Sequence, residues 1–269
     1  MAALALVSLI ASGTACDDDT GSGGEGGEGG SGGDGGSAGG DGGGGAGGDD
    51  GGGGSGGGEP TIVLYGSIFE FPSNQPIEDG DVCFLAEGVE LCTELGVQGA
   101  YFIDDLPIST QGGFRIRAPT LPTSYLMFKT QAEGDGEVHF ILPSHASLDS
   151  LYEAAQLTRT PTSAAVFIAG TSQALPVLTP TSGEGPYYLT GSGELDLEAM
   201  ATVDIGVGLF LDVDRAAGPF TAHLEVEGVV CDFNFYGAKV SEPWDLPDDA
   251  AQVFVHARCP EPGEEGDLP

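Results

Sequence analysis

The stretch that decides the fold is DVCFLAEGVELCTE, residues 81–94. It reads as two strands around Glu87-Gly88, a pair suited to a two-residue hairpin turn because glycine accepts positive φ. Pairing outward from this turn places Cys83 opposite Cys92 at a non-hydrogen-bonded site, where Cα atoms are about 4.5 Å apart. A disulfide tolerates that separation, so the stretch predicts an antiparallel hairpin closed by its own bridge.

The same register divides the hairpin into two faces. One face is apolar and predicts a core; it carries Val82, Phe84, Ala86, Val89 and Leu91. The face that bears the two cysteines also carries charges and is expected to be wet; these are Asp81, Glu90 and Glu94. Alternation of this kind is typical of a half-buried antiparallel sheet.

Other segments with strand character lie on both sides of the hairpin. Those on the first stretch of chain are 61–70, 100–103, 114–120, 124–130 and 137–142. Residues 147–157 have helical spacing, with Leu148, Leu151, Tyr152 and Ala155 on one face. A second series of segments with strand character comprises 164–170, 175–178, 200–213, 220–226, 229–237 and 251–259, and residues 185–198 suggest a hairpin loop. The prediction is an all-β chain of tandem small antiparallel β-sandwich domains.

Several short motifs resemble the carboxypeptidase regulatory-like domain, a transthyretin-like β-sandwich. The counterparts of its pattern here are Tyr65–Ile68, Gln75–Val82, Gly99–Phe102 and Leu106-Pro107. The resemblance implies one such sandwich over 61–145, a linking helix or loop over 146–162, a divergent second sandwich over 163–260 and an acidic tail over 261–269. It implies no carboxypeptidase activity, because the zinc site of those enzymes belongs to a separate catalytic domain.

The N-terminus has the character of a targeting segment. Residues 1–12 are largely apolar, have the length of a signal-peptide core and are too short to span a membrane. Gly13-Thr14-Ala15-Cys16 resembles the lipobox of bacterial lipoproteins, which implies a signal peptide over 1–15 and a lipid anchor on Cys16. The implied location is the outer membrane or surface of a Gram-negative cell. Ordinary signal cleavage, leaving a secreted protein, is the alternative.

Cysteine usage agrees with export. The chain has five cysteines, and lipidation of Cys16 leaves an even set of four, as expected in an oxidising compartment. Four cysteines allow three pairings. The hairpin register favours Cys83 with Cys92, and therefore Cys231 with Cys259.

Residues 16–60 are predicted to be a disordered linker. They hold 26 of the 48 glycines and almost nothing apolar, so they bury too little surface to offset the entropy of ordering. The whole chain has 7 basic and 42 acidic residues and a net charge of −35. Nucleic acid is therefore excluded as a partner, because that affinity depends on lysine and arginine.

No catalytic residue, metal or cofactor is predicted. His139, His145, His223 and His256 lack metal-ligand spacing. The acids of residues 185–198 could bind a hard cation, but their spacing favours a hairpin loop. Trp244 and Tyr236 are weak candidates for a ligand contact, with a lid over a sandwich edge as the alternative for Trp244.

The sequence thus predicts a non-enzymatic envelope lipoprotein on a flexible tether, acting as a structural, adhesion or binding module. The expected partners are the membrane, through the lipid anchor, and an envelope protein or polysaccharide; the expected oligomeric state is a monomer. A carbohydrate-binding surface domain is the first alternative. An acid-catalysed hydrolase, using two of the many carboxylates, is the second.

Overall fold

The computed structural model describes residues 60–131, 136–203, 206–231, 234–235, 238–239 and 243–257. The predicted signal peptide, Cys16, the linker, Tyr236, Cys259 and the acidic tail lie outside these residues. The described chain is built mainly of β-strands, which confirms the all-β class. No helix within the described ranges has the length and apolar character needed to cross a membrane.

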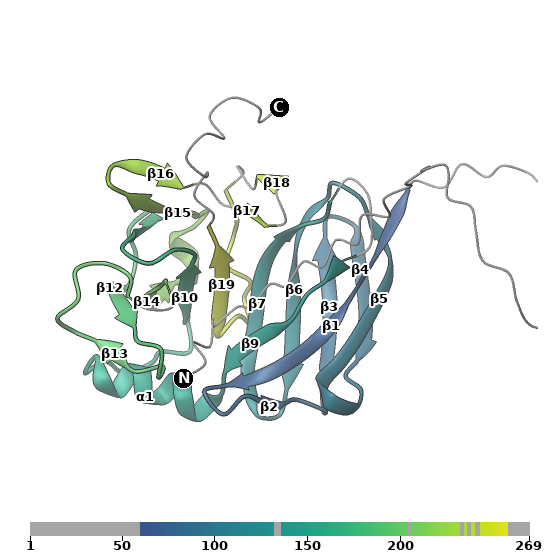
Figure 1. The fold of residues 1–269 in the computed structure, drawn as a ribbon, viewed down its shortest axis with the longest axis horizontal. Coiled ribbons are helices and arrows are strands. Elements are labelled where there is room, and N and C mark those ends of the chain that lie inside the picture. Colours follow the sequence, from purple (N-terminus) through teal and green to yellow (C-terminus); the bar gives the residue numbers. More distant parts are fainter. Residues whose placement is uncertain are drawn as a thin grey trace, which may run out of the picture. The chain divides into compact units, whose positions relative to one another are not determined.

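The largest sheet has nine strands in the described part of the chain (Figure 1). In spatial order they are β13 (Leu195–Asp196), β12 (Glu184–Leu189), β14 (Val207–Asp214), β10 (Ser163–Ala169), β19 (Gln252–His256), β7 (Leu121–Lys129), β6 (Gln111–Ala118), β3 (Asp81–Ala86) and β4 (Val89–Glu94). The sheet therefore runs through both of the predicted sandwich regions, 61–145 and 163–260.

Three smaller sheets and a helix accompany it. The five-stranded sheet consists of β1 (Thr61–Phe71), β2 (Gln75–Pro76), β5 (Ala100–Pro107), β8 (Gly136–Glu137) and β9 (Phe140–Pro143). A three-stranded sheet is formed by β11 (Leu175–Thr179), β15 (Thr221–Val226) and β16 (Val229–Cys231), and a two-stranded one by β17 (Asn234–Phe235) and β18 (Ala238–Lys239). The helical elements are α1 (His145–Ala154) and the short 3₁₀ turns η1 (Val97–Gly99) and η2 (Arg215–Ala217).

The hairpin of residues 81–94 folds as predicted. Strands β3 and β4 pair antiparallel in the expected register, with Cys83 opposite Cys92. Gly88 in the turn has φ of 71°, which a glycine adopts without the steric penalty of a side chain. The disulfide joins Cys83 and Cys92, whose Cα atoms are 4.0 Å apart.

One face of the nine-stranded sheet is apolar across eight strands, from β4 to β12. The registers align one side chain per strand in a single row, which consists of Leu91, Phe84, Phe114, Leu126, Phe254, Phe167, Leu209 and Tyr187. The row belongs to cluster 1, a core that also takes in Ile68 of β1, Tyr101 of β5 and Phe140 of β9. Phe114 lies 5.4 Å from Phe140, centroid to centroid, so the five-stranded sheet packs directly on this face.

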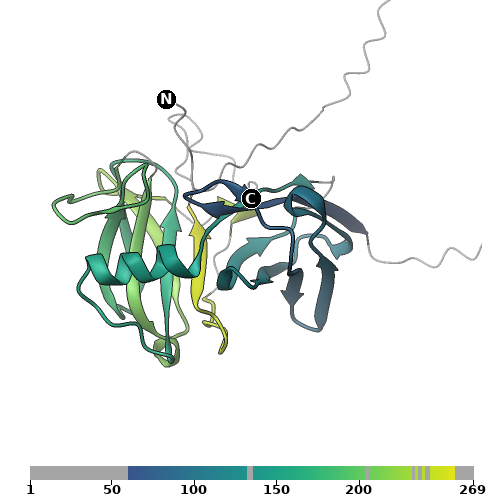
Figure 2. The same ribbon diagram turned by 90° about the horizontal axis from the view of Figure 1, so that it is seen from below.

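Helix α1 covers the other end of the same face. Ser144 caps its N-terminus by accepting a hydrogen bond from the backbone N–H of Ser147, as N-cap serines do. Its apolar stripe, Leu148, Leu151 and Tyr152, is buried in cluster 1, and Figure 2 shows the helix lying across the strands of the C-terminal half. The predicted linking element is therefore a packed layer of the fold.

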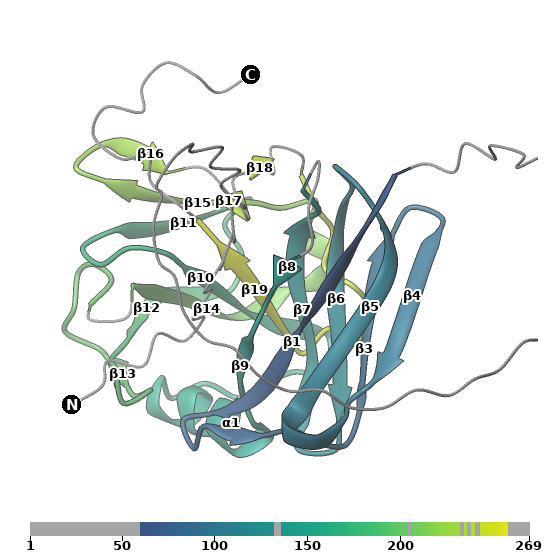
Figure 3. The ribbon, with the colours of Figure 1, turned by 45° about the vertical axis from the view of Figure 1, so that its right-hand side comes forward.

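The opposite face of the sheet is apolar only in its C-terminal half. There Val166 of β10, Phe210 of β14 and Val253 of β19 form cluster 2 with Leu178 of β11 and Leu224 of β15. The sheet β11–β15–β16 covers this half (Figure 3). The second region is therefore a sandwich with a sheet on one side of its central strands and a helix on the other.

The structure differs from the predicted, purely antiparallel arrangement in four pairings. Strand β19 runs parallel to both β10 and β7, and β1 runs parallel to β8 and β9. Parallel partners need a long connection, and β19 follows β7 by more than 120 residues. The residues Gln252–Val255 are all buried, as expected for an interior strand covered on both faces. Through β19, the two predicted sandwiches share one sheet.

Candidate functional site

The second face of the nine-stranded sheet changes from apolar to polar along one row. From cluster 2 the row continues to Tyr125 on β7, Arg115 on β6, Cys83 on β3 and Cys92 on β4. We call the polar end of this face the polar face and define it by Cys83, Glu90, Cys92, Arg115, Arg117, Tyr125 and Asp249. In this region, charged side chains lie next to the disulfide between Cys83 and Cys92.

Arg115 is the centre of the polar face. Its Nη2 donates to Glu90 Oε1 at 2.8 Å and approaches Cys83 Sγ to 3.3 Å. The arginine side chain is only 15% exposed, whereas that of Glu90 is 58% exposed. The buried Nε of Arg115 has no hydrogen-bond partner among the described residues. A guanidinium is always charged, so a fixed cation lies beside the sulfur of Cys83.

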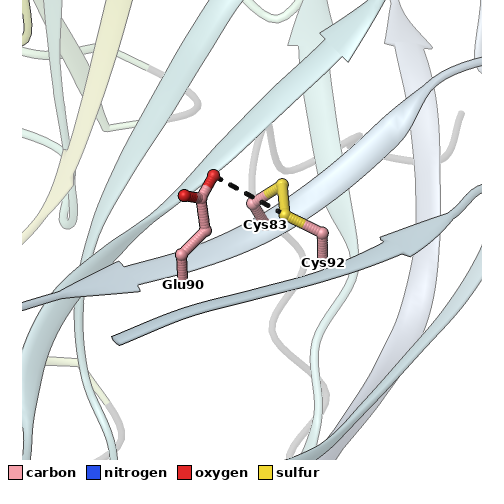
Figure 4. Close-up of side chains that lie close together, drawn as sticks. All are labelled: Cys83, Glu90 and Cys92. Atoms are coloured by element: carbon pink, nitrogen blue, oxygen red, sulfur yellow. Dashed lines mark hydrogen bonds between the residues drawn. A yellow bond between two sulfur atoms is a disulfide. The ribbon is translucent and has the colours of Figure 1, made fainter. Parts of the chain in front are cut away.

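Figure 4 shows the carboxylate of Glu90 beside the disulfide. Glu90 Oε1 lies 3.8 Å from Cys92 Sγ. Cys83, Glu90 and Cys92 are the one group of potential metal ligands found close together in the described chain. Their sulfurs are bonded to each other, and only a thiolate sulfur acts as a metal ligand. The group is therefore a disulfide site in this state.

Asp249 connects the polar face to the loop before β19. Its two carboxylate oxygens accept hydrogen bonds of 2.6 Å from the hydroxyl of Tyr125 and from Arg117 Nη2. Burial, followed by the hydrogen bond to Asp249, raises the pKa of Tyr125 to about 12. Burial raises the pKa of Asp249, but the hydrogen bonds from Tyr125 and Arg117 outweigh it, and the net pKa is lowered. Asp249 is thus held as a carboxylate.

A second polar cluster lies where α1 leads into β10. Asp212 Oδ1 accepts hydrogen bonds from Ser163 Oγ at 2.5 Å and Thr160 Oγ1 at 3.0 Å. The backbone N–H of Asp212 donates to the hydroxyl of Tyr152, whose pKa is raised by burial. Asp212 has φ of 55°, an uncommon conformation for a non-glycine residue. These hydrogen bonds join the segment after α1 to β14, so the role of the cluster is structural.

One of the two predicted disulfides, between Cys83 and Cys92, is confirmed. Cys231 is completely buried in cluster 2 and is disulfide-bonded. Its predicted partner, Cys259, and the predicted lipidation site, Cys16, lie outside the described residues, so both of those expectations remain predictions.

The predicted ligand contact at Trp244 does not fit the structure. Trp244 is 5% exposed, and its ring packs on Phe220 with centroids 5.6 Å apart. Backbone hydrogen bonds in both directions also join these two residues. A buried ring offers no face to a sugar, so the interpretation of Trp244 as a lid over the sandwich edge fits the structure. Tyr236 lies outside the described residues.

The predicted hairpin of residues 185–198 is present as β12 and β13. Asp196 Oδ1 accepts from the backbone N–H groups of Glu198 and Ala199, so this carboxylate holds its own turn. Two of the predicted histidines have local partners. His139 Nε2 lies 3.2 Å from Glu137, and His223 Nε2 lies 3.2 Å from Glu225.

Sequence reasoning missed the role of Arg115. The alternation in FRIRA puts Arg115 and Arg117 on the face opposite Phe114, as in the structure. The missing information was that β6 pairs with β3 with Arg115 opposite Cys83. This contact joins residues 32 positions apart, and no local pattern specifies such a register.

Comparisons with known proteins leave the family open. No family model and no curated protein matches this chain. The solved structures that resemble it include the TIE protein of Bacillus anthracis (9% identity, TM-score 0.26, 74% of this chain and 34% of that chain). They also include the shaft pilin SpaA of Lactobacillus rhamnosus GG (10% identity, TM-score 0.27, 78% of this chain and 100% of that chain). A streptococcal ancillary pilin is a third (9% identity, TM-score 0.20, 74% of this chain and 69% of that chain).

These similarities are too low to carry an argument about function. The chain spans about a third of the length of the Bacillus anthracis protein. The described residues themselves define the class: a β-sheet protein with one large sheet, two cores and three disulfide-bonded cysteines.

Proposed function

We propose that this chain is a non-catalytic module of the bacterial cell envelope, with a structural, adhesion or binding role. The observation that carries the proposal is the disulfide between Cys83 and Cys92, because such bonds form and persist in oxidising compartments outside the cytosol. The buried disulfide-bonded Cys231 supports the same compartment. The fold supports a module, since both faces of the central strands are buried between layers.

The proposal includes a lipid anchor on Cys16 and a flexible linker over 16–60. Its support is the sequence Gly13-Thr14-Ala15-Cys16 and the glycine-rich composition that follows. Within the linker, residues 17–59 form a Gly-rich coil of 43 residues with an end-to-end distance of about 35 Å, enough to hold a domain away from a membrane surface. We also retain the likeness of residues 61–145 to the carboxypeptidase regulatory-like domain, supported by the two-sheet packing around cluster 1.

Two observations weigh against the alternatives. Carbohydrate binding was predicted from Trp244 and Tyr236; Trp244 is buried, and Tyr236 lies outside the described residues. For a hydrolase, two of the candidate carboxylates are already engaged in hydrogen bonds: Asp249 with Tyr125 and Arg117, and Asp212 with Ser163. We therefore carry one function forward.

Metabolic labelling tests the anchor directly. The full chain is produced in a Gram-negative host fed an alkyne fatty acid, together with a Cys16→Ser variant and a Cys92→Ser variant as matched control. We expect label on the wild type and on Cys92→Ser, and neither label nor membrane association in Cys16→Ser. Recovery of wild-type chain that retains residues 1–15 or carries an unmodified Cys16 would overturn the anchor.

A further inference from the structure

The bridge between Cys83 and Cys92 is chemically asymmetric. Cys83 is on β3, an inner strand of the sheet, and is 1% exposed. Cys92 is on β4, the last strand of the sheet at this edge, and is exposed. Thiol–disulfide exchange requires a thiolate to reach one sulfur of the bond. From solvent, the reachable sulfur is that of Cys92.

The charges around the bridge favour departure of the other sulfur. Arg115 Nη2 lies 3.3 Å from Cys83 Sγ, and a neighbouring arginine stabilises a thiolate. A carboxylate lies beside each sulfur, with Asp81 Oδ1 3.4 Å from Cys83 Sγ and Glu90 Oε1 3.8 Å from Cys92 Sγ, so the cation of Arg115 is what distinguishes the two sulfurs. Because a more stable thiolate leaves faster, opening of the bond by attack at Cys92 would place the negative charge on Cys83, beside the cation.

We expect the fold to persist when the bridge is open. Strand β3 is hydrogen-bonded on both sides, to β4 and to β6, and its inner side chains Val82 and Phe84 are fully buried in cluster 1. The two cysteines are nine positions apart. Closure of so short a loop contributes about 2–3 kcal/mol, less than the usual stability of a domain of this size. The open form should therefore keep the native fold.

We propose that Cys83–Cys92 is a thiol–disulfide exchange site whose partner is a dithiol reductant, with Cys92 as the attacked sulfur and Cys83 as the leaving thiolate held by Arg115. The partner thiolate forms a bond to Cys92 Sγ, and the electron pair of the old bond goes to Cys83 Sγ. The second partner thiolate then attacks its own sulfur of the mixed disulfide and releases Cys92. The protein gains two electrons, and the partner is oxidised to its disulfide.

The first test uses glutathione on the native full chain, with quenching by acid and N-ethylmaleimide and peptide mass spectrometry. We expect glutathione on Cys92 and not on Cys83 at early times, while the bond of the buried Cys231 stays closed. Glutathione on Cys83, or opening of the Cys231 bond at the same rate, would overturn the proposal, since the second result would mean that reduction requires unfolding.

The second test separates the role of Arg115 from general stability. In Arg115→Gln we expect the rate of bond opening to fall about tenfold, because the leaving thiolate loses its cation, and in Arg115→Lys to recover in part. The matched control is Arg117→Gln, two positions along the same strand, for which we expect a change of less than about twofold. Equal rates in Arg115→Gln and Arg117→Gln, with both variants folded by circular dichroism, would contradict the role of Arg115.

Discussion

The two faces of the nine-stranded sheet are formed by the same strands but differ in the polarity of their side chains. On one face the row from Leu91 to Leu209 is apolar throughout and belongs to cluster 1. On the other face the row is apolar at Phe210 and Val166 but ends in the ionic and sulfur groups of the polar face. The C-terminal half of the sheet thus has an apolar core on both faces, whereas the N-terminal half has one on a single face and carries polar groups on the other.

The largest expected effect comes from breaking the apolar row where the two halves meet. Phe254 of β19 stacks on Phe167 of β10 with centroids 4.6 Å apart. We expect Phe254→Ala to lower the free energy of unfolding by about 3–5 kcal/mol, as for other buried phenylalanines. The matched control is Phe102→Ala, because Phe102 is 56% exposed, and the expected change there is below about 0.5 kcal/mol.

Denaturant titration of Phe254→Ala also tests whether the halves unfold together. Trp244 fluorescence reports on cluster 2, and hydrogen exchange of β3 and β6 reports on the N-terminal half. Since β19 pairs with strands of both halves, we expect the two probes to give one coincident transition. A shift of the Trp244 transition alone would show that the halves are independent domains.

The second largest expected effect is the loss of stability when the disulfide of the polar face is removed. Removing the bridge in the double variant Cys83→Ala/Cys92→Ala should lower stability by about 2–3 kcal/mol, because the unfolded hairpin regains the freedom of the closed loop. Urea unfolding measures this loss. Glu94→Gln, an exposed neighbour on the same face, is the control and should change stability by less than about 0.5 kcal/mol. Loss of folded protein in the double variant would mean that the bridge is essential to the sheet.

The third effect appears at alkaline pH. The pKa of Tyr125 is raised to about 12, so its stabilising contribution is complete below the ordinary tyrosine pKa of about 10 and is lost as the pH rises toward 12. By pH 11 we expect a loss of about 1 kcal/mol that Tyr125→Phe does not show. Tyr65→Phe, at an exposed ring, serves as control, and identical alkaline profiles for Tyr125→Phe and wild type would contradict the prediction.

The smallest effect belongs to the exposed ion pair. The side chains of Arg117 and Asp249 are 46% and 42% exposed, so Arg117→Met should cost no more than about 0.5 kcal/mol at pH 7. Because the pKa of Asp249 is lowered in the folded state, this contribution is present above the ordinary aspartate pKa and disappears as the pH falls through the folded value. Urea titrations at pH 7 and pH 3 measure it; an equal cost at both would exclude an ionic origin.

The local parts of the fold could be predicted from the sequence. The turn at Glu87-Gly88 and the pairing of Cys83 with Cys92 follow from short-range geometry, and the structure confirms both. Helix α1 followed from the spacing of Leu148, Leu151 and Tyr152, although it begins two residues earlier than predicted because Ser144 caps it. Such features depend on neighbours in the chain, whose spacing the sequence states directly.

The long-range pairings could not be predicted. The segment AQVFVH was assigned to the second sandwich, but as β19 it lies between β10 and β7. Its apolar core VFV, residues 253–255, is typical of an interior strand, but it does not specify which strands lie beside it. For the same reason the contact of Arg115 with Cys83 was missed, since it depends on the register of β6 against β3.

The position of β19 determines when the protein can finish folding. Strands β7 and β10 each lack a neighbour on one side until residues 252–256 are available, and an unpaired strand edge is a template for association with other chains. From the end of β10 at Ala169 to the start of β19 at Gln252 the ribosome adds 83 residues, which takes roughly 4–17 s at synthesis rates of about 5–20 residues per second. Over this interval a nearly complete chain carries two open sheet edges, which are the surfaces that a chaperone would need to cover.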